Sequence, residues 1–427
     1  MTRKLVDDCF YHDPRDEHRL SHDEAIAHLK AQVSPVVGTV ELTGIEAVGR
    51  ISAEPVKALR PVPGHTNAAV DGYAFSHRDL ERDGDTLLEV VGRAAAGSPY
   101  VGPQLPKQAV RIFTGAVVPD GCDTVAMQED CGVGFEGANT VSIPPGLKAG
   151  ANVRGAGEDV QTGQTLMSCG DPIRPQDVAA IASVGLDKIK CFDRLRVAVV
   201  STGDEVLRAG AGEPKLGQVF DTNAPLLLAL CGLAGCTVSD LGVWPDDRQA
   251  VDMRLAAAAR DYDVVLTSGG ASLGEEDYMA QAITDLGQRH FWQIAVKPGR
   301  PLMFGQIGDT VIVGLPGNPV AVFVCFLMYV YPVLRRLGGA TWPEPRRFAL
   351  PAAFAVENRK IGRREFWRGT TVQAVDGLQV EKYPRDGSGL ISGLRAADGL
   401  IDISEVRPSV ERGDFVDFIP FSEYGIT

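Results

Sequence analysis

Three glycine-rich loops that carry charged side chains follow one another in a short part of the sequence. They read SGGASLGEED at 268–277, KPGRP at 297–301 and GLPGNP at 314–319. The first loop follows an apolar, β-branched run at 263–267, which predicts a strand that ends in an abrupt turn. Because glycine has no side chain, backbone N–H groups in such a turn can approach a phosphate or another oxyanion closely. Together the loops indicate an anion site, although each alone is also common turn chemistry.

Carboxylates in the first loop point to a metal ion as well. Gly269 and Gly274 have the spacing of P-loop glycines, but acidic residues stand at 275–277, where a P-loop has Lys and Ser or Thr. These carboxylates would repel a phosphate unless a cation lay between them. Mg²⁺, a hard cation that takes oxygen ligands, would bridge protein carboxylate and substrate phosphate. We therefore predict a Mg²⁺ site in this region.

The other two loops supply positive charge. Lys297 and Arg300 stand beside Pro298 and Pro301, whose rings fix the backbone and limit how far the two cations can move. This arrangement suits a small oxyanion. The third loop leads into an apolar run at 320–334 that predicts a helix, and a helix N-terminus offers unpaired N–H groups and a positive dipole end.

The charge of the chain restricts its partners. It has 427 residues, a formal net charge of −13 and a hydrophobic fraction of 44%, as an ordinary globular protein has. Nucleic acid requires a basic face, so it is not an expected partner, whereas a local group of cations can still bind a small anion. The length predicts about three domains.

The cysteine and histidine residues do not indicate a metal centre. None of the eight cysteines forms a CxxC pair or a zinc-ligand spacing, so idle thiols of a cytosolic protein are expected. Four histidines near the N-terminus stand among acidic residues at helical spacing, which favours a solvent-exposed helix face. They are His12, His18, His22 and His28.

The sequence predicts neither a signal peptide nor a membrane span. The first twenty residues are highly charged and lack an apolar core. The apolar run at 320–334 has fifteen residues and is interrupted by Pro332, whereas a spanning helix needs about 20. We expect a buried core helix in a cytoplasmic protein.

Alternating strands and helices from residue 196 onward predict a parallel α/β sheet. Parallel strands of an open sheet place ligands beyond their carboxyl ends. Polar clusters follow three strands, at 202–205, 246–247 and 268–277, and are expected to face one cleft. Singly, Glu205 would be a turn residue and Asp246 a helix N-cap. The predicted elements are strands at 197–201, 237–241 and 264–267 and helices at 224–233 and 248–260.

The remaining segments differ in kind. Ser21 followed by Glu24 predicts a helix N-cap with a capping box. Short β-rich runs between Gly38 and Ile143 alternate with turns and predict a separate β-rich module. From about Arg346 onward, alternating runs predict a small all-β domain with a loop at 387–389.

A set of motifs gives the chain a family resemblance. They are, in order, NAAVDGYA at 67–74, RIFTGA at 111–116, GEDV at 157–160, STGDEV at 201–206, DTN at 221–223, SGGASLGEEDY at 268–278, KPGRP and GLPGNP. With these motifs the chain resembles the molybdopterin molybdenumtransferase family, which includes the E domain of gephyrin. The resemblance extends from about residue 20 to the end.

The resemblance implies the last step of molybdenum cofactor biosynthesis. In that step molybdate, as co-substrate, is inserted into adenylylated molybdopterin and AMP is released, with Mg²⁺ as cofactor. A catalytically silent molybdopterin-binding scaffold or chaperone protein of the same fold is the alternative. The preceding adenylyl transfer is a second enzyme alternative, against which the additional N-terminal and C-terminal modules argue.

Site residues follow from the motifs that match. Carboxylates around Mg²⁺ and the pyrophosphate, with catalytic roles, would be Asp277, Asp246 and Glu205. Molybdate would be bound by Lys297, which is also catalytic, and by Arg300, Arg363 and Ser388, with Arg364 as a substitute for Arg363. Other substrate-binding residues would be Asp71, Thr114, Ser268, Gly269, Gly270, Ser272, Pro316, Gly317 and Asn318. The chain departs from the family at Arg300, where Lys is usual, and at Ala68, where Ser is commoner.

The resemblance also implies a multidomain fold and an elongated homodimer in which Asp71 and Thr114 reach the partner subunit's cleft. Its domains would be a discontinuous linking domain at 1–43 and 150–191, an inserted β-rich domain at 44–149, a doubly wound α/β molybdopterin-binding domain at 192–340 and a C-terminal β-barrel at 341–427. Further partners would be the upstream adenylyltransferase and downstream molybdoenzymes.

Overall fold

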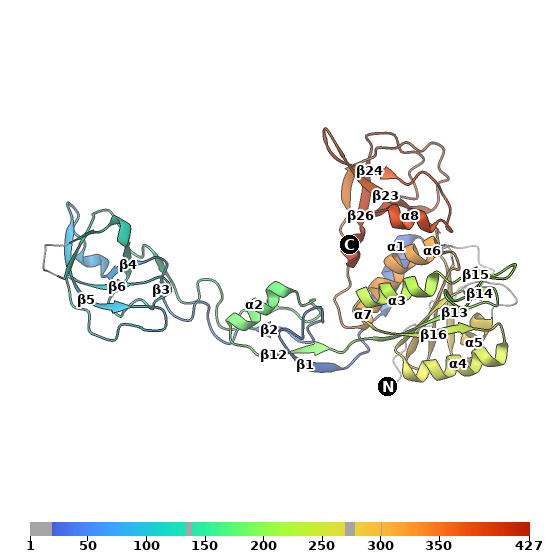
Figure 1. Ribbon diagram of the computed structural model, residues 1–427, viewed down its shortest axis with the longest axis horizontal. Helices are drawn as coiled ribbons and strands as arrows, with labels where there is room; N and C mark the ends of the chain where they lie inside the picture. The colour runs from blue at the N-terminus through green and yellow to red at the C-terminus, as the bar shows by residue number, and fades with distance from the viewer. Residues whose placement is uncertain (1–18, 134–138, 270–277, 300) are drawn as a thin grey trace.

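The computed structural model describes residues 19–133, 139–269, 278–299 and 301–427. The molecule is elongated (Figure 1). A β-rich module lies at one end, and a small module that contains α2 (Pro175–Ser183) lies in the middle. The α/β domain and the C-terminal domain lie together at the other end. The residues expected to form sites are therefore distributed over separate modules.

The α/β domain is built on a six-stranded sheet of order β16-β13-β17-β21-β20-β18. The first four strands are parallel, and the last two extend the sheet antiparallel. The three strands predicted from residue 196 onward are confirmed as β13, β16 and β17. The bounds are β13 Arg196–Thr202, β16 Thr237–Trp244, β17 Val264–Ser268, β18 Gln288–Gln293, β20 Pro301–Ile307 and β21 Thr310–Leu315.

Helices cover both faces of this sheet. Val197 and Val199 of β13 pack with α3 and with the helix at 319–337, whereas Ala198 and Val200 enter a second core with α4 and α5. Alternate residues of one strand thus fill two cores, as in a doubly wound sheet. The helices are α3 Asn223–Leu233, α4 Arg248–Asp261 and α5 Tyr278–Leu286, and the first two confirm the predicted helices.

The apolar run after the third glycine loop forms one long helix. It comprises α6 (Pro319–Cys325), the π-helical turn η4 (Phe326–Val330) and α7 (Tyr331–Leu337). Within the described residues it is the one helix long and apolar enough to cross a membrane, but 83% of its apolar stretch is buried inside the protein. The predicted core helix is therefore confirmed.

The N-terminal helix α1 (His22–Gln32) packs into the core of the α/β domain through Ala25 and Leu29. Its predicted capping box is confirmed, since the Glu24 N–H donates to Ser21 Oγ and the Ser21 N–H donates to Glu24 Oε2. The predicted solvent-exposed histidine face is wrong at His22, which is 5% exposed. Its ring lies edge-on to Tyr329 and Phe366, two residues remote in the sequence. His12 and His18 lie outside the described residues.

The middle module is made from two separate stretches of chain. β1 (Thr39–Thr43) pairs with β12 (Lys188–Phe192), and β2 (Val56–Lys57) pairs with β11 (Thr165–Met167). Ala47 and Val56 share a core with residues of the second stretch. By this packing residues 44–58 lie with the linking stretches, whereas the family resemblance assigned them to the inserted domain.

The β-rich module at the end of the molecule contains a six-stranded sheet of order β7-β4-β6-β5-β9-β8. A short pair of β3 and β10 lies where the two connections enter. The bounds are β3 Asn67–Ala68, β4 Gly72–Phe75, β5 Thr86–Ala94, β6 Gln108–Ile112, β7 Thr124–Met127, β8 Gly132–Val133, β9 Thr140–Ile143 and β10 Val153–Arg154.

The C-terminal domain is a curled sheet of order β19-β23-β25-β26-β22. A further strand, β24, pairs with the second half of β23, from Gly369 to Ala374. Ala352, directly after β22, forms a bridge with Val380 of β24, so the strands come close to forming a closed ring. A short helix, α8 (Ile391–Ala396), is added to the all-β domain that we predict from sequence. The bounds are β22 Phe348–Pro351, β23 Arg364–Ala374, β24 Gly377–Lys382, β25 Gly399–Ile403 and β26 Phe415–Pro420.

One strand of the C-terminal sheet comes from the α/β domain. β19 (Val296–Lys297), in the second glycine loop, pairs in parallel with β23 and places Lys297 beside Glu365. The N–H of Arg364 donates to the carbonyl of Ala295, whose own N–H donates to Leu20. Three distant segments are thus held together by backbone hydrogen bonds at the junction of the two domains.

Stability should fall as the pH falls below about 6.5, because of His22. Burial, with the nearby charge of Arg364, lowers the pKa of His22 from 6.5 to about 4. The unfolded chain binds this proton first, so the contribution of His22 is complete above the unfolded pKa and is lost as the pH falls from 6.5 towards 4. The loss is at most about 3 kcal/mol.

Urea unfolding at several pH values across this window measures the effect. His22→Gln should flatten the pH dependence, whereas His65→Gln, a change at an exposed histidine, should leave it as in the parent. A slope that is the same in His22→Gln as in the parent would contradict the assignment.

Candidate active site

Two of the polar clusters expected at one edge of the sheet are joined there. β13 and β16 are parallel neighbours, so the loops that follow them begin at the same edge. The N–H of Asp204 donates to Oδ2 of Asp246 at 3.4 Å, and the N–H of Asp246 donates to Oδ1 of Asp204 at 3.3 Å. Both residues are exposed. The carboxylate that adjoins Asp246 is therefore that of Asp204, which is not among the site residues expected from the motifs.

Glu205 lies on the turn itself. Its carboxylate is so close to Gly203 that a Cβ on Gly203 would collide with it, and Gly203 has a φ of 125°, which favours glycine. The alternative reading of Asp246 as a helix N-cap is wrong. Asp247 is the N-cap of α4, and its Oδ1 accepts the N–H of Ala250 at 2.8 Å. Asp246 remains at the sheet edge without a capping role.

Asn223 connects the first and third glycine loops. Its Nδ2 donates to Ser268 Oγ and to the carbonyl of Gly317, both at 2.7 Å. Asp221 holds the start of α3, because its Oδ1 accepts from the N–H groups of Asn223 and Ala224. Two predicted substrate-binding residues are thus brought together. Asn223 Oδ1 is buried and has no hydrogen-bond partner among the described residues, so a ligand that donates a hydrogen bond could pair it.

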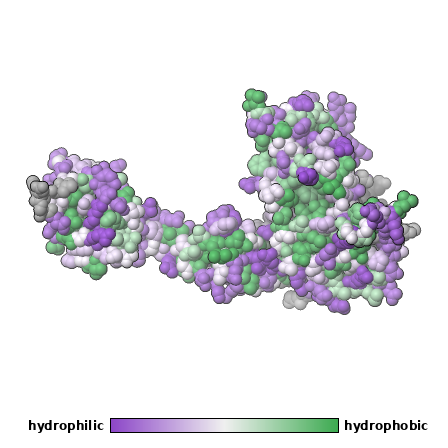
Figure 2. All heavy atoms as spheres, viewed as in Figure 1, coloured by the Kyte–Doolittle hydropathy of each residue, from purple (hydrophilic) through white to green (hydrophobic). Residues whose placement is uncertain are grey.

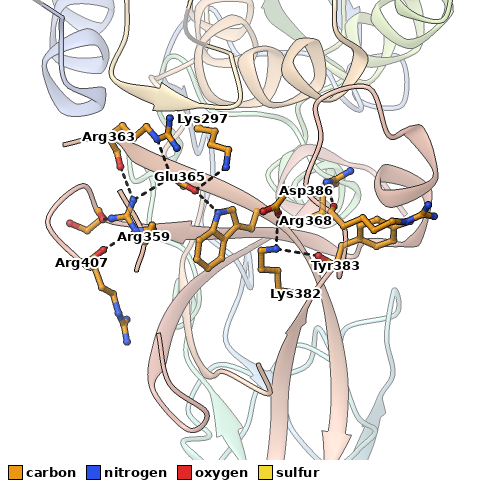
Figure 3. Close-up of polar contacts among 12 residues, drawn as sticks. Lys297, Arg359, Arg363, Glu365, Arg368, Lys382, Tyr383, Asp386 and Arg407 are labelled. Atoms are coloured by element: carbon orange, nitrogen blue, oxygen red, sulfur yellow. Dashed lines mark hydrogen bonds and ion pairs between the residues drawn. The ribbon is translucent and has the colours of Figure 1, made fainter. Parts of the chain in front are cut away.

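A second group of charges lies at the junction with the C-terminal domain (Figure 3). Glu365 is its centre, and three cations surround it. Glu365 Oε1 lies 3.0 Å from Arg363 Nε and 3.7 Å from a terminal nitrogen of Arg359. Oε2 lies 3.7 Å from Lys297 Nζ and accepts from Trp367 Nε1 at 2.8 Å. Lys297 and Arg363, both predicted to bind molybdate, therefore share one carboxylate.

Arg364, the alternative to Arg363, is engaged elsewhere. Its Nε lies 2.7 Å from Oδ1 of the buried Asp402, and another nitrogen lies 3.2 Å from Asp23 of α1. Arg364 and Glu365 are adjacent on β23, and adjacent side chains of a strand point to opposite faces. The geometry thus places Arg363, and not Arg364, in the cluster with Lys297.

A cavity of about 320 Å³ opens beside this cluster. Lys297 lines it together with Ser388, the fourth predicted molybdate ligand, and the backbone N–H of Val320 donates to the carbonyl of Ser388 at 2.9 Å. The loop that carries Ser388 is held by Arg368, which donates to the carbonyls of Leu390 and Arg385. Arg300 lies outside the described residues.

Lys382 and Asp386 also line the cavity and form an ion pair of 2.7 Å. Burial opposes ionisation of Asp386, but the hydrogen bond and charge of Lys382, with the charge of Lys297, lower the pKa of Asp386 below its usual value. The cavity wall is therefore positively charged with few uncompensated carboxylates, as an oxyanion requires.

Asp71 and Thr114 lie together on the β-rich module. Asp71 Oδ1 accepts from the backbone N–H of Thr114 at 2.8 Å and from its hydroxyl at 2.7 Å, and these two bonds lower the pKa of Asp71. Phe113, next to Thr114, lies under the guanidinium groups of Arg93 and Arg111. Figure 1 shows this module at the far end of the chain from the α/β domain, so Asp71 does not join the cleft of its own chain.

Comparison with known proteins decides the family. The family model "MoeA N-terminal region (domain I and II)" matches residues 20–185, "Probable molybdopterin binding domain" matches 198–336, and "MoeA C-terminal region (domain IV)" matches 351–421. The chain belongs to the molybdopterin molybdenumtransferase, or MoeA, family.

Individual relatives match along nearly the whole chain. Molybdopterin molybdenumtransferase of Haemophilus influenzae is 36% identical over 406 residues, which are 94% of this chain and 99% of that protein. Gephyrin of Dictyostelium discoideum is 30% identical over 74% of this chain and 49% of its own length. The crystal structure of the MoeA protein of Pyrococcus horikoshii OT3 has a TM-score of 0.82 at 26% identity and covers 94% of this chain and 100% of its own.

Of the three carboxylates expected from the MoeA resemblance to hold a metal ion, Asp246 and Glu205 are described and Asp277 lies outside the described residues. The substrate-binding positions Gly270 and Ser272 also lie outside them. Within the described part of the chain, no three His, Cys, Asp or Glu side chains group closely enough to hold a metal ion. Asp204 and Asp246 offer adjacent, exposed carboxylates of the hard type that Mg²⁺ takes.

Several residues of the site were not selected from the MoeA motifs. Glu365 and Arg359 lie close in sequence to Arg363, and Asp204 stands within STGDEV. Their closeness to motif residues could have indicated them from the sequence. Arg368 and Lys382 had no such signal, because their place in the cavity depends on how β23 and β24 pair.

Thr114→Val should raise the pKa of Asp71, because it removes the hydroxyl that donates to the carboxylate, while the N–H of residue 114 still donates. Carboxyl NMR titration of Asp71 measures the change. Thr43→Val, which removes the hydroxyl bond to Glu46, is the matched control and should shift Glu46 but not Asp71. An Asp71 titration that is identical in Thr114→Val and the parent would show that the hydroxyl bond does not form in solution.

Proposed function

We propose that this chain inserts molybdate into adenylylated molybdopterin and releases AMP, the final step of molybdenum cofactor biosynthesis. Relatives named molybdopterin molybdenumtransferase match nearly its full length. The observation that carries the proposal is the cavity at the domain junction, where Lys297 and Ser388 meet and Arg363 shares Glu365 with Lys297.

In this proposal the cavity receives molybdate. Lys297 is 42% exposed and Arg363 29% exposed in their side chains, so both can turn to a small anion. The Ser388 hydroxyl would donate to a third oxygen, with Arg300 as a further cation. Arg300 offers a planar fork instead of the point charge of the usual Lys, so it could hold two oxygens of the ion.

The sheet edge would bind the anhydride that joins AMP to molybdopterin. Ser268 and Gly317 lie there, tied by Asn223. Gly269 adjoins them in the first loop, and Pro316 and Asn318 in the third. Asp246 with Asp204, and Asp277 and Glu205 by family resemblance, would hold Mg²⁺. When bound, Mg²⁺ would neutralise charge that develops as AMP leaves. The carboxylates also orient the loops, since Asp204 and Asp246 bond to each other's backbone.

A catalytically silent scaffold or chaperone is not favoured. Such a protein would have no need to keep cations around a cavity and carboxylates at strand ends, and packing alone explains neither. The surfaces that Asp71 and Thr114 present are too far from their own α/β domain to act in the same chain (Figure 1).

We further propose a cytoplasmic homodimer in which Asp71 and Thr114 serve the cleft of the partner subunit. Apolar residues gather on the visible face where the C-terminal and α/β domains meet (Figure 2). A groove there, of about 730 Å³, is lined by Leu226, Phe323, Leu394 and Phe421. An apolar surface of this kind supports a contact between copies. The upstream adenylyltransferase and downstream molybdoenzymes would be transient partners.

Release of AMP from adenylylated molybdopterin should depend on both molybdate and Mg²⁺. Lys297→Ala should raise the molybdate concentration needed for half-maximal release, and more molybdate should partly restore the rate. A lost hydrogen bond to a charged group weakens binding by about 1.5 to 3 kcal/mol, or roughly tenfold to a hundredfold. Lys30→Ala removes a lysine of similar exposure from a surface ion pair and should behave as the parent. If AMP release without molybdate and with a chelator equals the release with both ions present, the proposed function is wrong.

A shared site predicts complementation between two inactive variants. Asp71→Asn damages the part that the β-rich module supplies, and Lys297→Ala damages the cavity. Mixed dimers would contain one intact site each, so equal mixing with subunit exchange should restore roughly a quarter of the parental sites in a two-fold dimer. Activity of the mixture that stays at the sum of the two variants would exclude sharing between subunits.

A further inference from the structure

Glu365 is a buried carboxylate that pairs with Lys297, a residue in the wall of the cavity that we propose binds a dianion. Its side chain is 3% exposed, so water cannot compensate its charge. A carboxylate at this place should repel molybdate. Packing alone therefore does not explain why a buried carboxylate lies beside Lys297.

The contacts of Glu365 differ in how firmly they are held. Arg359 is a fixed partner, because its side chain is buried and its nitrogens also donate to the carbonyls of Arg407, Arg363 and Ser404. Trp367 Nε1 is fixed as well, by a 2.8 Å bond. Lys297 makes a longer contact of 3.7 Å and is 42% exposed, so it is the partner most easily drawn away.

The charges around the carboxylate leave a positive excess of two units. Lys297, Arg359 and Arg363 carry three positive charges, and Glu365 removes one of them. Lys382 and Asp386, on another wall of the cavity, neutralise each other. Arg368, which also lines the cavity, adds a further positive charge. Without Glu365, the positive charge beside the cavity would be one unit greater, and the site would hold a dianion more tightly.

Asp402 provides a comparison within the same sheet. It is also buried and also lies between two arginines, Arg347 at 3.1 Å and Arg364 at 2.7 Å. It stands on β25 opposite Phe366, the residue that follows Glu365 on β23. Among the described residues it forms no ion pair with Lys297 or Arg363. The two carboxylates thus have similar structural surroundings, but of the two only Glu365 pairs with Lys297 of the cavity wall.

We propose that Glu365 is the internal counter-ion of the oxyanion site and sets its affinity. In the empty site it neutralises Lys297 and Arg363 in part. When a dianion enters, Lys297 turns from Glu365 to the ion, while Arg359 and Trp367 keep the carboxylate compensated. The resulting affinity is low enough for the ion to be released as well as bound. This role rests on the proposed function, because it takes the cavity as the molybdate site.

Glu365→Gln tests the role through direct binding. The substitution keeps the shape and an acceptor for Trp367, and it removes the negative charge. Titration calorimetry of the full chain with molybdate alone should show affinity about tenfold tighter than in the parent, because one repulsive charge near a dianion is gone. Sulfate, a dianion of the same shape, should gain by a similar factor.

The direction of the change separates this role from structural damage, since a distorted site would bind molybdate more weakly. Asp402→Asn is the matched control: it should lower the unfolding temperature as a buried-charge change does and leave molybdate affinity as in the parent. If Glu365→Gln does not fold, Glu365→Asp keeps the charge but draws it back from Lys297, and molybdate should then bind severalfold more tightly.

The outcomes are distinguishable. Parental binding of molybdate with unchanged or weaker binding in the folded Glu365 variants overturns the counter-ion role and leaves the proposed function standing. Absence of molybdate binding in both the parent and the Glu365 variants overturns the molybdate site in this cavity and the counter-ion role with it.

Discussion

Backbone pairing between β19 and β23 brings Lys297 and Glu365 together, and the rest of the candidate site depends on it. Two residues of the α/β domain act as a strand of the C-terminal sheet, so the second glycine loop cannot move independently of that domain. The backbone bonds of Arg364 and Ala295 extend the junction to Leu20 before α1. Buried charges then fix it further, with Glu365 and Asp402 on opposite faces of β23 and β25.

The electrostatics of the site are local. A chain of net charge −13 repels anions at a distance, but salt screens exposed charges beyond about 10 Å. Within that distance the cavity wall presents Lys297 and a backbone-anchored Arg368, with Arg363 in the adjoining cluster around Glu365, while the nearest carboxylates are paired. A chain that is negative overall but positive at this pocket can therefore still bind a small anion there.

The elongated shape places one motif far from the others. NAAVDGYA and RIFTGA meet on the β-rich module, where Asp71 and Thr114 form one hydrogen-bonded unit. The middle module is built from two stretches of chain, which enter and leave the β-rich module. The pairs β1 with β12 and β2 with β11 hold these two stretches side by side, so the β-rich module stands apart from the α/β domain. A motif displaced in this way has chemical meaning only if another molecule approaches it.

The sequence by itself determined the elements, the glycine loops and the family. The strands at 197–201 and 264–267, the helix cap at Ser21 and the buried helix after GLPGNP all follow from short-range signals: side-chain period, turn residues and caps. Only the tertiary structure decided which charges meet. It placed Asp204 beside Asp246, buried His22 against Tyr329, separated Arg363 from Arg364 and set Glu365 beside Lys297. The physical reason is that periodicity reports how a segment faces its own neighbours, whereas these contacts join segments whose proximity is fixed by strand order and by the docking of one domain on another.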